Sequence, residues 1–213
     1  MILKYIRLLV LISIVPLPSA IKVAIYRLIF GWKIGRNVRI GFSLIEARNV
    51  EIGDFVKIGS FNLFRNCQDL VIGDSSIINN NNKIYGSHLK CQGWINKFQV
   101  GVKCYITSGH FFDIGGGVII DCYTVVGGRD THIWSHSIKI IDGRRELVPI
   151  RAKIGEKSYI GARVTLVCNS IPARTVVGAG SIIAKTFPSC TFEEGQLIAG
   201  NPAKILKKYR YID

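Results

Sequence analysis

Aliphatic residues recur every six positions along most of the chain, and a glycine or another turn-forming residue follows most of them. A period of six fits neither the repeat of an α-helix nor simple alternation. It is typical of a short strand of β-branched residues that ends in a turn, where glycine or asparagine is favoured. The in-phase positions are Ile34, Ile40, Ile52, Ile58, Phe64, Ile72, Ile78, Ile84, Val100, Ile106, Ile114, Ile120, Val126, Ile154, Ile160, Leu166, Ile171, Val177 and Ile183.

Such units cannot bury their apolar position alone, so the chain should coil and the coils should stack around a ladder of these residues. If three units close one triangular coil, equivalent positions recur at every third unit. Cys104 is then expected to stack on Cys122, which holds the same position three units later. Residues 85–99 and 127–153 interrupt the repeat. Loops extruded from a regular scaffold often carry function, so these two segments are the first places to search.

The first thirty residues have a different pattern, mostly apolar with four basic residues and two prolines. Their longest uncharged run, residues 8–21, is shorter than the ~20 residues of a membrane span. We expect two amphipathic helices, at residues 2–15 and 19–30, with aliphatic side chains buried and basic ones near an interface. The sequence is compatible with two roles for these helices, contact with a membrane and capping of the core. A signal peptide cleaved after Ser19-Ala20 is a further alternative.

The pattern thus divides the chain into three parts: a helical segment at residues 1–31, a β-solenoid at 32–187 with an extruded loop at about 127–153, and a C-terminal extension at 188–213. A content of 48% hydrophobic residues excludes disorder. The net charge of +14 favours anionic partners without choosing among them. The chain has neither a helix-turn-helix nor a zinc pattern, and its basic C-terminus lacks aromatic platforms, so nucleic acid is disfavoured. The six cysteines show no C-x-x-C spacing, which indicates reduced thiols.

Histidine has the ordinary pKa that suits a general base at neutral pH, and the chain has four. His136 begins an interruption of the repeat, and His110 is followed by Asp113 and then Gly115–Gly117, where a ligand could approach the backbone. His88 and His132 are expected to be structural or exposed. His132 and His136 lie four apart, but on a coil rather than a helix this spacing does not indicate a metal pair, so no metal is expected.

Polar and aromatic residues near these histidines are candidates for binding a substrate. Asp113 and Asp130 would orient an imidazole or accept hydrogen bonds from a sugar, although turn formation explains them comparably well. Arg129 and Trp134 flank the 127–153 segment. The indole face of Trp134 suits stacking on a sugar, and packing against the coil is an equal alternative.

The repeat, the runs 154–162 and 177–181 and the closing Ala199-Gly200-Asn201-Pro202-Ala203-Lys204 resemble the bacterial hexapeptide-repeat acyltransferases, over roughly residues 32–206. The resemblance implies a left-handed parallel β-helix, a homotrimer, and acetyl-CoA in a groove between neighbouring subunits. The N-terminal segment resembles a subgroup associated with surface-polysaccharide gene sets. It implies O-acetylation of a sugar on such a polysaccharide or on its lipid-linked precursor, at the cytoplasmic face of the membrane, where CoA is available.

The resemblance also implies roles for individual residues. His136 corresponds to the catalytic base that precedes a loop and a proline-containing return, with His110 as a partner or substrate-orienting residue. Gly161, Ala162, Gly178 and Ala179 would lie beside the pantetheine arm, and Lys185 and Lys204 would meet the phosphates of CoA, unless they belong to a solvated basic tail. The rivals are N-acetylation of an amino-sugar nucleotide, transfer of another acyl group, and a non-catalytic β-helix scaffold.

Overall fold

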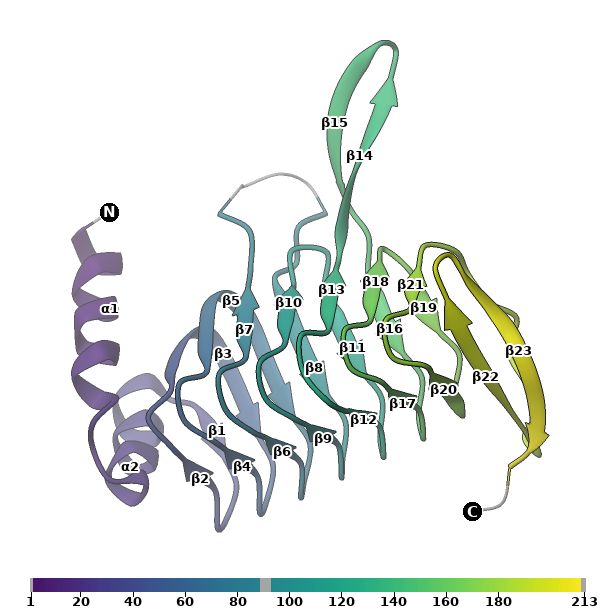
Figure 1. Cartoon of the computed structure of the whole chain (residues 1–213). Helices are drawn as coiled ribbons and strands as arrows, with labels where there is room; N and C mark the ends of the chain where they lie inside the picture. Colours follow the sequence, from purple (N-terminus) through teal and green to yellow (C-terminus); the bar gives the residue numbers. More distant parts are fainter. Residues whose placement is uncertain (1, 89–92, 212–213) are drawn as a thin grey trace.

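A computed structural model describes residues 2–88 and 93–211 as a left-handed parallel β-helix with two helices at its N-terminal end (Figure 1). Short strands join the coils along three faces. The first face contains β1 (Lys33–Ile34), β3 (Leu44–Ile52), β5 (Leu63–Ile72), β8 (Lys97–Val100), β11 (Val118–Ile120), β16 (Ala152–Ile154) and β19 (Ser170–Ile171). The second contains β2 (Arg39–Ile40), β4 (Lys57–Ile58), β6 (Ile77–Ile78), β9 (Tyr105–Ile106), β12 (Val125–Val126), β17 (Tyr159–Ile160) and β20 (Thr175–Val177). The third contains the first residues of β3 and β5, then β7 (Lys83–Tyr85), β10 (Phe111–Asp113), β13 (His132–Trp134), β18 (Thr165–Val167) and β21 (Ile182–Ile183).

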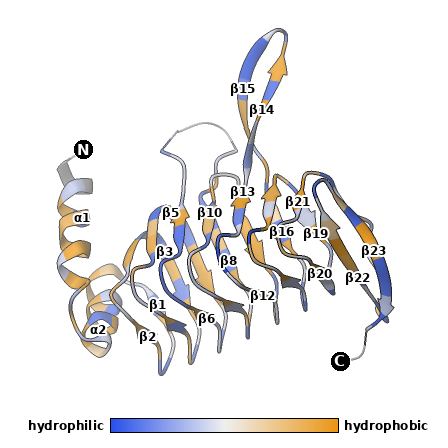
Figure 2. Cartoon of the chain, in the orientation of Figure 1, coloured by the Kyte–Doolittle hydropathy of each residue, from blue (hydrophilic) through white to orange (hydrophobic). Residues whose placement is uncertain are grey.

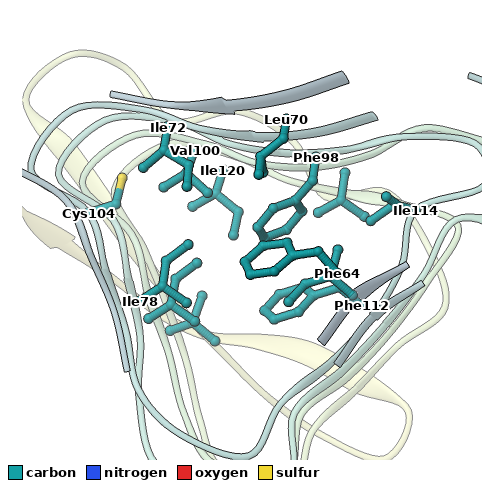
Figure 3. Packing of buried hydrophobic residues seen from close by; sticks show 14 of the residues in the cluster. Phe64, Leu70, Ile72, Ile78, Phe98, Val100, Cys104, Phe112, Ile114 and Ile120 are labelled. Carbon is teal, nitrogen blue, oxygen red and sulfur yellow. The ribbon is translucent and has the colours of Figure 1, made fainter. Parts of the chain in front are cut away.

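The six-residue pattern marks the interior of the β-helix. Every in-phase residue that the sequence predicts is buried, and the in-phase side chains stack in ladders from coil to coil (Figure 3). Aromatic rings fill the middle of the core, where the centroid of Phe98 lies 5.1 Å from that of Phe112 and 6.3 Å from that of Phe64. Since each ladder position excludes water from its neighbours, this stack is the main source of stability.

The expected coil of three regular units holds for the first coil and not for later ones. Ile40 pairs with Ile58, its equivalent three units later, whereas Ile106 pairs with Val126, which lies two positions beyond that spacing. Cys104 therefore lies level with Thr124 and not with Cys122, so the predicted stack of two cysteines is wrong. The physical reason is two extra residues between Phe112 and Ile120, where the chain turns from the third face to the first.

The two helices, α1 (Ile2–Ile14) and α2 (Ser19–Phe30), close the open end of the first coil. Lys22 is fully buried and donates from Nζ to the carbonyl oxygens of Ile40 and Gly41. Arg27 donates to the carbonyl oxygens of Ile34 and Gly35. These strands have no preceding coil, so their backbone groups need other partners.

The prediction that the aliphatic side chains of these helices are buried and the basic ones lie near an interface holds only in part. Arg7, Lys22 and Arg27 face the coil, while large apolar side chains of α1 and α2 are exposed: Tyr5, Ile6, Leu9, Val10, Ile12, Ile21, Leu28 and Ile29. Other apolar side chains of these helices, namely Leu11, Ile14, Val23 and Tyr26, are buried against the coil, so the coil end takes up both basic donors and apolar residues. Figure 2 shows the apolar colouring along α1. Within the described residues, neither helix is long and apolar enough to cross a bilayer.

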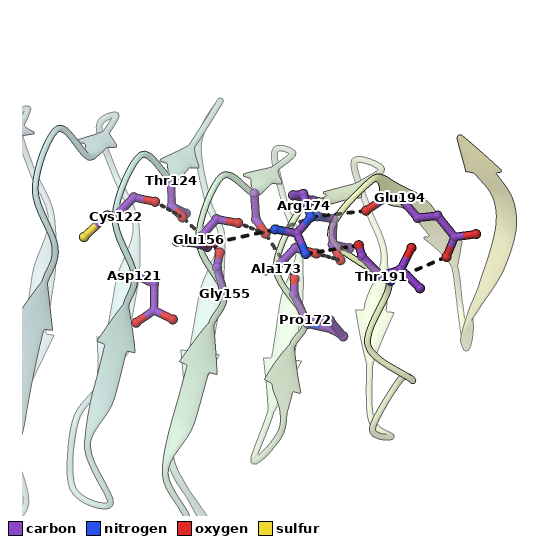
Figure 4. A network of polar contacts seen from close by, with 12 residues as sticks. Asp121, Cys122, Thr124, Gly155, Glu156, Pro172, Ala173, Arg174, Thr191 and Glu194 are labelled. Carbon is purple, nitrogen blue, oxygen red and sulfur yellow. Dashed lines mark hydrogen bonds and ion pairs between the residues drawn. The ribbon is translucent and has the colours of Figure 1, made fainter. Parts of the chain in front are cut away.

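The other end of the β-helix is closed by a hairpin of β22 (Glu194–Gly200) and β23 (Ala203–Arg210). Strand β22 extends the second face, and β23 folds back against it in the antiparallel direction. The nearly buried Arg174 fixes the segment before this hairpin, since its guanidinium donates to the carbonyl oxygens of Thr191 and Glu194 (Figure 4). It also lies 3.5 Å from the carboxylate of Glu156.

Two excursions leave the coil at the same corner, between the third and first faces (Figure 1). One joins β7 to β8. The other is the antiparallel hairpin of β14 (His136–Ile141) and β15 (Arg144–Pro149), which projects from the end of β13. One coil without an excursion lies between them, and it turns at Asp113–Gly117. The corner therefore gathers residues that are far apart in the sequence.

Candidate active site

His136 and Asp113 form a hydrogen-bonded pair at this corner. The distance between His136 Nδ1 and Asp113 Oδ2 is 2.6 Å. Asp113 ends β10 and His136 begins β14, and the parallel pairing of β10 with β13 brings the two together. The carboxylate is largely buried and also accepts hydrogen bonds from the backbone N–H of Ser135, at 2.9 Å, and of Gly115, at 3.3 Å. The backbone thus fixes the carboxylate, and the carboxylate fixes the imidazole.

The pairing decides which ring nitrogen of His136 is available. A carboxylate accepts the proton of Nδ1, which leaves the lone pair of Nε2 free in the neutral ring. Nε2 makes no hydrogen bond within the described part of the chain, and the side chain is 32% exposed. A positioned imidazole with a free Nε2 can take a proton from a substrate, and a buried carboxylate stabilises the imidazolium that results.

Neighbouring residues restrict the ring of His136 further. Its centroid lies 5.6 Å from that of Trp94 and 6.4 Å from that of Trp134. The thiol of Cys168 donates to the carbonyl oxygen of His136 at 2.9 Å. Residues from three coils and from both excursions therefore fix the position of the His136 ring.

The glycines after Asp113 do not leave room for a ligand to approach the backbone, contrary to what the sequence suggested. A Cβ on Gly115 would collide with the ring of Trp94, and a Cβ on Gly116 would collide with the carbonyl oxygen of Ser135. The space that we expected a ligand to use is taken by the first excursion and by the base of the hairpin. These glycines let the chain itself pack closely around the site.

His110 has a different environment from His136. It is buried, and the backbone N–H of Thr131 donates to its Nδ1 at 3.2 Å. Its Nε2 lies 2.8 Å from the hydroxyl of Thr107, which itself donates to the carbonyl oxygen of Gly128, so Nε2 carries the proton. Burial lowers the pKa of His110 to about 4. Both nitrogens are used inside the coil, so Asp113 pairs with His136 and not with His110.

The other predicted substrate residues lie on both sides of the third face. Arg129 and Asp130 occupy its corner with the second face, where Asp130 adopts a positive φ in the turn. Trp134 lies on the face itself, beside His136. His132 is exposed next to it, and His88 bonds to Asn66 in the first excursion. Of these predicted residues, Trp134 lies beside His136, whereas Arg129 and Asp130 lie at the opposite edge of the third face.

The predicted donor residues stack along that far edge. A Cβ on Gly161 would lie 2.8 Å from the backbone nitrogen of Ala179, and one on Gly178 would lie 2.8 Å from Cβ of Ala199. Lys204 pairs with Ala199 across the C-terminal hairpin, so it lies at the same corner. The members of this small-residue strip are Gly128, Gly161, Ala162, Gly178 and Ala179.

Lys185 follows β21 at the corner of His136, with its Nζ 5.4 Å from the ring of Phe187. The third face separates the small-residue strip from His136, so a single chain does not bring the two together. Among the described residues, no three histidine, cysteine or acidic side chains are grouped as metal ligands. Five cysteines are free thiols, and Cys91 lies outside the described residues.

Sequence reasoning missed Trp94 and Cys168, which contact the catalytic candidate from other coils. The one signal for Trp94 is its place in residues 85–99, which interrupt the repeat. Cys168 gives no signal, because only the register of β13 and β18 places it beside His136.

Comparison with known proteins agrees with this fold. No family model matches the chain. It is 31% identical over 189 residues to the bifunctional protein GlmU of Acinetobacter baylyi, covering 78% of this chain and 39% of GlmU. It is 28% identical over 190 residues to GlmU of Acinetobacter baumannii, with the same coverage. The chain thus spans about two fifths of the length of these relatives.

Solved structures with a similar fold are acyltransferases. A variant of AntD, an N-acyltransferase from Bacillus cereus in complex with dTDP and coenzyme A, matches with a TM-score of 0.50 and 14% identity, over 86% of this chain and 87% of AntD. A hexapeptide-repeat acetyltransferase from Vibrio cholerae, complexed with acetyl-CoA, matches with a TM-score of 0.45 and 20% identity, over 95% and 88%. With its six-residue repeat and stacked parallel coils, the chain has the hexapeptide-repeat β-helix fold, and AntD shares this fold.

Proposed function

We propose that this protein is an acetyl-CoA-dependent O-acetyltransferase whose acceptor is a sugar hydroxyl of a cell-surface polysaccharide or of its lipid-linked precursor. The observation that carries the proposal is the 2.6 Å hydrogen bond from His136 Nδ1 to the buried carboxylate of Asp113, which leaves Nε2 free. The fold shared with AntD adds weight, since that N-acyltransferase was solved with coenzyme A. Cytoplasmic placement follows from the need for CoA.

The proposed reaction is a direct transfer in which His136 moves one proton. Nε2 takes the proton of the acceptor hydroxyl while the hydroxyl oxygen attacks the thioester carbonyl. The carbonyl π electrons move onto oxygen, and the tetrahedral oxyanion then collapses as the C–S bond breaks. The imidazolium returns its proton to the departing thiolate, so the products are the acetyl ester and CoA. Asp113 stabilises the imidazolium between the two proton transfers.

We propose that the donor binds along the small-residue strip, where the absence of long side chains leaves room for a pantetheine arm. Lys204 is placed at one end of the strip to pair with phosphate, and Lys185 is a second candidate. Because the strip and His136 lie at opposite edges of the third face, the complete site requires a second copy of the chain. This supports a homotrimer with shared sites.

The β14–β15 hairpin supports the same assembly. Ile138, Ile140, Ile141 and Leu147 are exposed on a two-stranded hairpin that projects from the coil. An isolated two-stranded hairpin is at best marginally stable in water, so a neighbouring subunit is a natural partner for these side chains.

The function is tested by measuring CoA release and acetyl incorporation with wild-type protein and with His136→Ala, over a panel of surface polysaccharides. His136→Ala should abolish transfer and leave the oligomer intact, while His88→Ala, a surface histidine outside the site, should retain activity. Full activity of His136→Ala would refute the proposal. Acetylation of amino-sugar nucleotides alone would favour N-acetyl transfer, and absence of any transfer or CoA binding would favour a scaffold.

We also propose that the exposed apolar face of α1 and α2 makes peripheral contact with an anionic membrane. The apolar side chains would enter the interface, and the net charge of +14 favours anionic lipids. Leu9→Asp and Leu28→Asp should reduce co-sedimentation with anionic vesicles, whereas Leu206→Asp, an exposed leucine of the C-terminal hairpin, should not. Equal sedimentation of all three would contradict the contact.

A further inference from the structure

The outer surface of the third face carries an aromatic patch directly beside His136. Strands β7, β10 and β13 place Lys83, Phe111 and His132 in one row across the coils, because Phe111 pairs with both of the others. Tyr85 and Trp134 project from the next outward positions of β7 and β13. The rings are in contact, with the centroid of Phe111 5.0 Å from that of Trp134 and 5.8 Å from that of His132.

This aromatic patch is confined to the coils around the candidate base. On the coil before it, the equivalent outward positions of β5 carry Leu63 and Arg65, and on the coil after it, those of β18 carry Thr165 and Val167. The core does not require outward aromatic rings, since ladder residues such as Ile84 and Ile133 already fill the interior. The patch therefore needs an explanation other than the fold.

A groove of about 490 Å³ lies over this patch. Its volume falls in the range of about 300–1,000 Å³ that is typical of small-molecule sites. Asn81 and Lys83 line one side of the groove, and Gly109 and Asp130 lie at the corner with the second face. Trp134 lines the end nearest to His136. His136 is not part of this lining, and Trp134 connects the groove to it, since the ring centroids of Trp134 and His136 lie 6.4 Å apart.

The chemistry of the lining selects a class of ligand. The negative faces of aromatic rings attract the C–H face of a sugar, while Asn81 and Asp130 offer hydrogen-bond partners to hydroxyl groups. Lys83 is exposed and makes no ion pair within the described residues. Asp130 lies 3.9 Å from Arg163, so its charge is already partly balanced. The groove thus has one ammonium group without a counter-ion.

We propose that this groove is the acceptor subsite and that it takes a sugar unit bearing an anionic group, which pairs with Lys83 while the ring packs on Phe111 and Trp134. The inference rests on the proposed transferase function, whose acceptor it specifies. It assigns Lys83 as a specificity residue that contacts the substrate and takes no part in proton transfer.

Binding is measured by calorimetric titration of the full chain, without donor, with a hexuronate oligomer, a neutral hexose oligomer of the same length and a hexose phosphate. The hexuronate oligomer should bind about two- to fivefold more tightly than the neutral oligomer, as expected for an exposed ion pair. Binding of the hexose phosphate with the same preference would identify phosphate as the anionic group. Equal binding of charged and neutral sugars would overturn the assignment of Lys83.

Two variants separate the contribution of the Lys83 charge to sugar binding from that of the Phe111 ring. Lys83→Gln should lower affinity for the acidic sugar to that of the neutral one, while Phe111→Ala should weaken both. Lys57→Gln is the matched control, because Lys57 occupies the outward position before Ile58 on the second face, as Lys83 does before Ile84 on the third. Dissociation of the oligomer by Phe111→Ala would show that a second copy covers the patch, and would refute the subsite.

The outcomes distinguish this inference from the function on which it rests. If the acidic sugar binds in a manner that depends on Lys83 but His136→Ala does not affect transfer, the subsite stands and the proposed mechanism fails. If His136-dependent transfer occurs to an acceptor whose KM is unchanged by Lys83→Gln and Phe111→Ala, the mechanism stands and the subsite fails.

Discussion

Replacement of Asp113 by asparagine should disable His136 while preserving the shape of the site. Oδ2 of Asp113 accepts from both Ser135 N and His136 Nδ1, and Oδ1 accepts from Gly115 N. An amide offers one oxygen and one NH2 group in these two positions. If its oxygen faces His136, the NH2 group opposes the N–H of Gly115. If it turns over, the N–H of Ser135 loses its partner, and His136 must carry its proton on Nε2, where it cannot act as a base.

The size of the effect follows from these contacts. A hydrogen bond to a charged group contributes about 1.5–3 kcal/mol, and each 1.36 kcal/mol of transition-state stabilisation changes a rate about tenfold. Loss of the charge beside the imidazolium should therefore slow the reaction by about 10- to 100-fold. The wrong tautomer adds to this loss, so we expect kcat of Asp113→Asn to fall by about 10²–10⁴ with KM little changed.

The assay follows CoA release at saturating donor and acceptor, together with ¹⁵N shifts of the His136 imidazole. Wild-type protein should show the Nδ1–H tautomer, and Asp113→Asn should populate the Nε2–H tautomer. Asp121→Asn is the control, since Asp121 pairs with Lys153 on the surface of the coil. A kcat of Asp113→Asn within threefold of wild type, or an unchanged tautomer in a folded protein, would refute the reasoning.

Three further predictions concern stability. The unfolded chain protonates His110 near pH 6.5, but the folded chain only near pH 4, so the free energy of unfolding should fall by about 3 kcal/mol as the pH drops between these values. Urea titrations should show this slope, and a His110→Gln variant that keeps it would contradict the assignment. Phe112→Ala should cost about 3–5 kcal/mol in thermal unfolding, against less than ~1 kcal/mol for the exposed Phe192→Ala. Lys22→Met keeps the side-chain length but removes the ammonium donor from the carbonyl oxygen of Ile40, whereas that of Gly41 keeps the N–H of Ser43. It should cost about 1–3 kcal/mol and speed amide exchange in α2; unchanged exchange would argue against the capping role.

The interior of the fold could be predicted because one physical rule sets it. Each strand buries one side chain per unit, so positions such as Ile58 and Val126 follow directly from the six-residue period. The register between coils could not be predicted, because extra residues at a corner change the coil length without disturbing the pattern on either side. The misplaced stack of Cys104 on Cys122 shows this limit.

The site was predictable only in part for the same reason. The interruption of the repeat pointed to His136, and a nearby carboxylate pointed to Asp113, but their contact depends on which coils lie side by side. The burial of His110 depends on Thr107 and Thr131, neither of which is distinctive in the sequence. The inward direction of Lys22 arises from unpaired carbonyl oxygens at the coil end, which hydrophobic patterning does not represent.

The most direct test of the central claim is calorimetric titration of the folded, oligomeric protein with acetyl-CoA and, separately, with CoA. The proposed transferase should bind both saturably, with one site per chain, and His136→Ala should retain this binding while losing transfer. Absence of binding by a folded oligomer would contradict a CoA-dependent transferase and would leave the β-helix as a scaffold or as the carrier of another chemistry.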